Sequence, residues 1–154
     1  MLFRSWLLPQ NSDQKEATIL NLIVSRTCTK TDSYRYSNII GIEKPWLNGV
    51  STDYFAAKNL APYNRVGCYY GTVHFWLSDL DKIWSDILSL PIHYYITMHP
   101  DFAAVPLDKH SQAVNRNYLP MLKRVQASGL FELEPPLTED PGILIFRRKD
   151  IVSH

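Results

Sequence analysis

Apolar and polar residues follow the clearest pattern between residues 65 and 98 of the chain. Residues 66–77 are rich in aromatic and β-branched side chains and carry apolar groups on both faces, which is typical of a central strand. Residues 78–81 (Ser-Asp-Leu-Asp) match a helix start signal, apolar residues at helical spacing follow, and Pro91 ends the helix. Residues 92–98 predict a second strand.

The first half of the chain allows two interpretations near its start. Residues 17–26 contain several β-branched side chains and have the length of a strand, so we expect a strand there. A helix over residues 14–26 is the alternative, because a capping-box pattern precedes it. Another strand is expected at residues 34–42 and a short helix at residues 52–60.

The last third of the chain predicts two adjacent helices over residues 111–128, divided by a proline and followed by Gly129 as a helix-ending glycine. Residues 130–134 and 143–149 predict an antiparallel pair with a proline-rich loop between them. Strands outnumber helices and a hairpin closes the chain. We therefore expect one globular α+β domain over residues 1–154, with a mainly antiparallel mixed sheet and helices packed on one face.

Composition limits the class of protein and its partners. Apolar residues make up 45% of the 154, enough for a core, and the net charge of +1 provides none of the basic excess that favours nucleic acid. No apolar run has the length needed to span a bilayer. We expect a soluble protein without a nucleic-acid or membrane partner.

The two cysteines, Cys28 and Cys68, are too few for a disulfide framework or a four-thiolate metal site. We expect two free thiols in a reducing compartment. The cytoplasm is therefore the predicted location.

Candidate catalytic residues are few. His99-Pro100-Asp101 with His110 resembles the ligand set of a two-histidine, one-carboxylate iron site. The strand series that usually carries such a site is missing, so we expect a polar turn here, with no metal and no cofactor. Glu132 and Glu134 share one strand face about 6.6 Å apart, which is also what the solvent face of a half-buried strand shows. Nucleotide-binding glycine loops and nucleophile elbows do not occur.

Nine tyrosines and four tryptophans in a nearly neutral chain favour a recognition role. Our leading hypothesis is a non-catalytic protein-binding domain of inhibitor, immunity or accessory type, which self-association would also fit. The expected contacts are large amphipathic side chains: Trp46, Tyr54, Tyr63, Tyr69 and Tyr95. The alternative is a small-ligand binder or enzyme with a cleft near the end of the strand at residues 92–98. That cleft would use His99, Asp101 and either His110 or Arg65.

Overall fold

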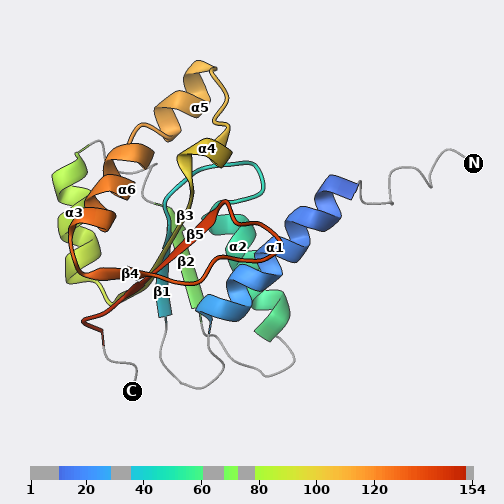
Figure 1. Ribbon diagram of the computed structural model, residues 1–154, viewed down its shortest axis with the longest axis horizontal. Coiled ribbons are helices and arrows are strands. Elements are labelled where there is room, and N and C mark those ends of the chain that lie inside the picture. Colours follow the sequence, from blue (N-terminus) through green and yellow to red (C-terminus); the bar gives the residue numbers. More distant parts are fainter. Residues whose placement is uncertain (1–10, 29–35, 61–67, 73–78, 152–154) are drawn as a thin grey trace, which may run out of the picture.

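The computed structural model describes residues 11–28, 36–60, 68–72 and 79–151 (Figure 1). Its helices are α1 (Asn11–Thr27), α2 (Gly49–Leu60), α3 (Leu80–Ser89), α4 (Pro100–Ala103), α5 (Lys109–Val114) and α6 (Tyr118–Ala127). Its strands are β1 (Tyr36–Ile40), β2 (Cys68–Thr72), β3 (Ile92–Met98), β4 (Phe131–Leu133) and β5 (Ile143–Arg148).

The strands form one mixed sheet in the order β2-β1-β3-β5-β4. β1 runs parallel to both β2 and β3, whereas β5 runs antiparallel to both β3 and β4. The predicted α+β class with a mixed sheet is confirmed. We expected a mainly antiparallel sheet, but parallel and antiparallel strand pairings are equal in number.

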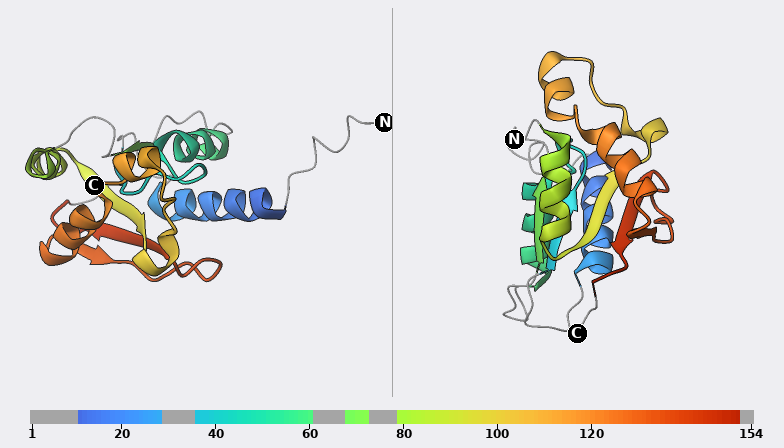
Figure 2. Two further views of the ribbon diagram at one scale, coloured as in Figure 1. Left: turned by 90° about the horizontal axis from the view of Figure 1, so that it is seen from above. Right: turned by 90° about the vertical axis from the view of Figure 1, so that its left-hand side faces the viewer.

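Helices cover both faces of the sheet rather than one. Figures 1 and 2 show α1 and α2 on one side and α3 and α6 on the other. The connection from β1 to β2 and the connection from β2 to β3 cross the sheet in opposite directions. Because such crossovers are right-handed, they place α2 and α3 on opposite faces.

Residues 17–26 form part of α1, so the predicted strand is wrong and the helical alternative is confirmed. The apolar residues lie at helical spacing and are buried in the core: Ile19, Leu20, Ile23 and Val24. The hydroxyls of Thr18, Ser25 and Thr27 each donate a hydrogen bond to the carbonyl four residues earlier. The helix therefore accommodates side chains that locally favour a strand.

Strong local signals match the structure well. Asp79 caps α3, accepting a hydrogen bond from the Asp81 N–H at 2.9 Å, and β3 has the predicted bounds. Gly129, after α6, has a φ of 70°, as a helix-ending glycine requires. The predicted proline break is displaced, because α5 ends at Val114 and Pro120 is the third residue of α6.

β2, the described part of the predicted strand at residues 66–77, lies at the edge of the sheet and not in its centre. Its outer edge is covered by α2. The Tyr70 N–H donates to the Asp53 carboxylate at 2.8 Å, and Gly49 approaches so closely that a Cβ there would come 2.6 Å from the Tyr70 carbonyl oxygen. Within β2 only one face is buried, because Tyr70 lies in the core whereas Tyr69 and Gly71 are exposed. Residues 66–67 and 73–77 lie outside the described residues.

Cys28 and Cys68 form a disulfide with their Cα atoms 5.8 Å apart, so the expectation of free thiols is wrong. Cys28 directly follows α1 and Cys68 begins β2. Beside the disulfide, the hydroxyls of Thr27 and Tyr70 share a buried hydrogen bond of 2.6 Å. The end of α1 is therefore tied to the edge of the sheet by one covalent bond and one polar contact.

Candidate functional site

An apolar groove lies between α1 and α2, with a volume of about 420 Å³. Two of its residues, Val50 and Tyr54, are 82% and 62% exposed. Apolar side chains dominate its lining: Ala17, Leu20, Trp46, Val50, Tyr54 and Phe55, with Glu16 and Ser51 at the polar positions. A gathering of exposed aromatic and aliphatic side chains is characteristic of a surface that another molecule covers.

The turn before α2 positions Trp46 at this groove. Asn48 holds the turn together, because its side-chain amide donates to the Lys44 carbonyl at 3.0 Å and its Oδ1 accepts from the Ser51 N–H at 2.9 Å. Leu47 is fully buried and anchors the same turn in the core. Trp46 therefore stands on a fixed backbone, which lowers the entropy lost when it contacts a partner.

Aromatic geometry and charge set the character of the groove. The rings of Tyr54 and Phe55 lie edge to face with centroids 5.4 Å apart, and the Lys58 ammonium lies 5.9 Å from the Phe55 centroid. Glu16 lines the groove without an ion-pair partner among the described residues. Among the described residues, the groove thus offers apolar surface together with one carboxylate that has no ion-pair partner.

The structure separates the five aromatic residues that the sequence proposed as contacts. Trp46 and Tyr54 come together in the groove, and Tyr69 is exposed on β2. Tyr95 is fully buried in β3, so its proposed contact role is corrected to a core role. Burial also raises the pKa of the Tyr95 hydroxyl above its ordinary value. Tyr63 lies outside the described residues, as does Arg65 of the alternative cleft.

His99 and Asp101 lie together but serve a structural purpose. His99 caps α4, because its Nδ1 accepts a hydrogen bond from the Asp101 N–H at 3.2 Å. The same nitrogen lies 3.6 Å from the Asp101 carboxylate. His110 lies on α5. Within the described ranges, no three His, Cys, Asp or Glu side chains gather as metal ligands would. His99 and Asp101 are both exposed, and neither lines the α1–α2 groove or two other pockets of the protein.

Glu132 and Glu134 do not form a catalytic pair. Both bind the exposed Arg147 side chain, at 2.7 Å and 2.8 Å. This arrangement agrees with the solvent-face interpretation of β4.

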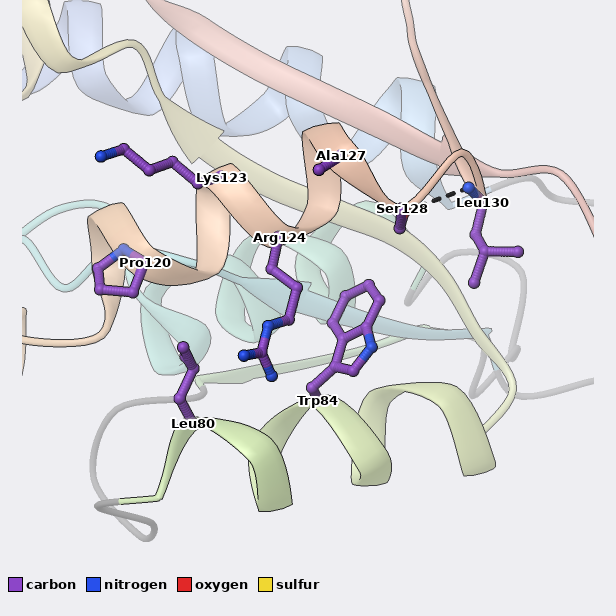
Figure 3. Close-up of a pocket in the computed structure, with 8 residues that line it drawn as sticks. All are labelled: Leu80, Trp84, Pro120, Lys123, Arg124, Ala127, Ser128 and Leu130. Atoms are coloured by element: carbon purple, nitrogen blue, oxygen red, sulfur yellow. Dashed lines mark hydrogen bonds between the residues drawn. The ribbon is translucent and has the colours of Figure 1, made fainter.

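A second concave surface of about 600 Å³ lies where α3 packs against α6. Figure 3 shows Arg124 extending from α6 toward α3, between Leu80 and Trp84. Its guanidinium binds the Asp81 carboxylate at 2.7 Å, and the Trp84 ring lies 6.4 Å from that of Phe131. The charges are largely matched here, so this surface is mainly a helix-packing seam.

Sequence reasoning missed the contact between Glu43 and Asn115, which are 72 residues apart. The Asn115 side chain accepts from the Glu43 N–H at 2.8 Å and donates to the Glu43 carbonyl at 3.1 Å. Burial raises the pKa of the Glu43 carboxyl, and the nearby His110 opposes that rise. No local sequence pattern predicts this hydrogen-bonded contact, because asparagine is equally common in ordinary turns.

No family model matches this sequence, and no curated protein or solved structure is detectably similar to it. Among the described helices, none combines the length and apolar character needed to cross a bilayer.

Proposed function

We propose that this chain is a non-catalytic protein-binding domain that docks an apolar segment of another protein in the α1–α2 groove. The supporting observation is that Val50 and Tyr54 of α2 are largely exposed and line one groove with Phe55 and with Trp46 of the preceding turn. Tryptophan and tyrosine are enriched among the residues that carry most of the binding energy in protein interfaces.

Charge defines the chemistry of the expected partner segment. Glu16 is the charged residue among those described as lining the groove. A segment that places apolar side chains against Trp46 and Tyr54 and a lysine or arginine against Glu16 would match both features. Helix-in-groove recognition commonly has this form, with an apolar stripe for affinity and a charge for orientation.

The disulfide bears on where this function takes place. Disulfides persist in oxidising compartments and are rare in the cytoplasm. The bond between Cys28 and Cys68 therefore favours an oxidising compartment over the cytoplasm expected from composition. We include this location in the proposal, and the oxidation state of the two cysteines in protein isolated from its native source tests it.

Site-specific photo-crosslinking tests the proposed docking. A benzoylphenylalanine at position 54 is compared with one at position 133, because Leu133 is also an exposed apolar residue but lies on β4. A protein captured only from position 54 is then purified and titrated against three chains: the wild type, Tyr54→Ser and Leu133→Ser. Sedimentation of the pure chain tests whether a second copy is the partner.

The expected result is binding that Tyr54→Ser weakens about ten-fold or more and that Leu133→Ser leaves unchanged. Capture of the same proteins from both positions, together with a strictly monomeric pure chain, would refute the proposal. Equal weakening by the two serine variants would refute it as well.

A further inference from the structure

A pocket of about 650 Å³ opens just beyond the carboxyl end of β3. It lies among α4, α5 and α6, which occupy the upper part of Figure 1. Its lining begins at Pro100, two residues after β3 ends, and continues through Ala103 and Ala104. Small-molecule sites commonly have volumes of about 300–1,000 Å³, so this pocket has room for a small ligand.

The position follows from the connectivity of the sheet. β1 and β3 are parallel neighbours, and the chain leaves β1 toward α2 on one face and leaves β3 toward α6 on the other. Ligands of open parallel sheets bind outside the carboxyl ends of strands, next to such a reversal. The pocket lies beside this point on the β3 side.

The wall of the pocket is largely apolar. Val105, Leu107 and Leu119 line it, and Leu107 and Leu119 are 87% and 44% exposed. Exposed leucines around a concave surface favour a ligand with an apolar body, because covering them removes apolar area from water.

Most polar groups of the lining already have partners. The Tyr118 hydroxyl donates to the Met98 carbonyl at 2.6 Å, and burial raises its pKa to about 12, so it stays protonated. The Asn115 side chain is held by Glu43 and by the Ser111 carbonyl. These groups shape the pocket but are not available to a ligand.

Arg116 and Gln112 are the polar exceptions among the described lining residues. Neither side chain has a hydrogen bond or an ion pair within the described part of the chain. The lining contains no carboxylate among its described residues. A guanidinium with free donors beside an apolar wall is suited to a carboxylate or sulfonate, which it can bind through two parallel hydrogen bonds.

We infer that this pocket binds a small amphiphilic organic anion. The aliphatic or aromatic body of the ligand covers Leu107 and Leu119, and its anionic head binds Arg116 with the Gln112 amide as a second donor. This inference concerns a different surface from the α1–α2 groove and does not depend on the protein-docking proposal.

The other concave surfaces are less suited to an anion. The α1–α2 groove carries Glu16, which repels an anion, and the α3–α6 seam has its Arg124 paired with Asp81. Lys123 lines that seam and is exposed, so replacing it provides the control for loss of a positive charge outside the proposed pocket.

Two fluorescent probes with the same aromatic body test the inference. Anilinonaphthalenesulfonate carries the anionic head, and phenylnaphthylamine lacks it. Each probe is titrated into the wild type, Arg116→Gln, Arg116→Lys, Lys123→Gln and Tyr54→Ser, and dodecanoate is used as a competitor. Circular dichroism and thermal melting check that each variant is folded, which we expect because the Arg116 side chain is exposed.

The expected result is saturable binding of the sulfonate at one site, with displacement by dodecanoate. Arg116→Gln should weaken it about ten-fold, and Arg116→Lys should retain part of the affinity. Lys123→Gln and Tyr54→Ser should bind like the wild type. The neutral probe should bind more weakly to the wild type and show no difference between wild type and Arg116→Gln.

Unsaturable binding of the sulfonate would overturn the inference. Equal affinity of the wild type for the two probes, or equal weakening by Arg116→Gln and Lys123→Gln, would also overturn it. Loss of binding in Tyr54→Ser would move the site to the α1–α2 groove and would equally reject this pocket.

Discussion

Replacing the buried Arg148 by methionine should destabilise the fold more than the same substitution at its exposed neighbour Arg147. Arg148 is only 7% exposed, and its guanidinium reaches the carboxyl end of α3. There it donates to the carbonyls of Ile87, Leu88 and Leu90 at 2.8, 3.1 and 3.1 Å. It thereby satisfies carbonyl groups that have no partner within the helix.

The magnitude follows from three contributions. The bond to the buried Ile87 carbonyl leaves an unsatisfied acceptor when it is removed, at about 1–3 kcal/mol. Loss of a cation at a helix carboxyl end adds about 0.3–1 kcal/mol. The ion pair with Asp150, at 2.7 Å, adds only about 0–1 kcal/mol, because that carboxylate is half exposed and screened by water. We expect a total of about 2–4 kcal/mol.

Guanidinium unfolding followed by tryptophan fluorescence measures this difference. Arg147→Met is the matched control, since Arg147 is adjacent but exposed, and its ion pairs within the described residues are with Glu132 and Glu134. It should cost less than about 1 kcal/mol. At about 2–4 °C per kcal/mol for a chain of this size, Arg148→Met should lower the melting temperature by about 5–15 °C.

The pH dependence provides a second test of the same contact. Hydrogen bonding to Arg148 lowers the pKa of Asp150 below its ordinary value of 3.8. This contribution to stability is therefore present above pH 3.8 and is lost as the pH falls through the lower folded-state pKa. Equal effects of the two methionine substitutions, or an effect of Arg148→Met below about 0.5 kcal/mol, would refute the reasoning.

Three further predictions concern covalent and close contacts. Reducing the disulfide should lower the free energy of unfolding by about 2–4 kcal/mol; an unchanged denaturation midpoint with dithiothreitol would contradict this. Burial raises the pKa of the Asp53 carboxyl above its ordinary value. The wild type should therefore lose stability relative to Asp53→Asn as the pH rises above 3.8. A difference in stability between the two proteins that does not change with pH would contradict this. Gly41→Ala should cost about 1–3 kcal/mol, since its Cβ would overlap the Tyr95 hydroxyl, and an unaltered melting temperature would argue against that packing.

The candidate site was only partly predictable. Trp46 and Tyr54 were proposed as contacts from residue type alone, and both line the α1–α2 groove. Tyr95 was proposed on the same basis but is buried, because β3 lies in the middle of a sheet with helices on both faces. Arg116 carried no sequence signal, since one arginine in a polar turn is unremarkable until an apolar pocket forms around it.

The sequence by itself determined the features whose causes lie within one or two turns of chain. The cap at Asp79, the bounds of β3 and the left-handed Gly129 are of this kind, and all three agree with the structure. Caps, periodicity and glycine conformations act between neighbours, so they can be recognised without knowing the rest of the fold.

Only the tertiary structure decided the features that depend on distant partners. Residues 17–26 are helical because a long apolar stripe packs against the sheet, although their β-branched side chains favour a strand locally. Cys28 and Cys68 are bonded because the end of α1 meets β2 across 40 residues. Both outcomes depend on how much apolar surface the packed elements remove from water, and a local pattern does not contain that quantity.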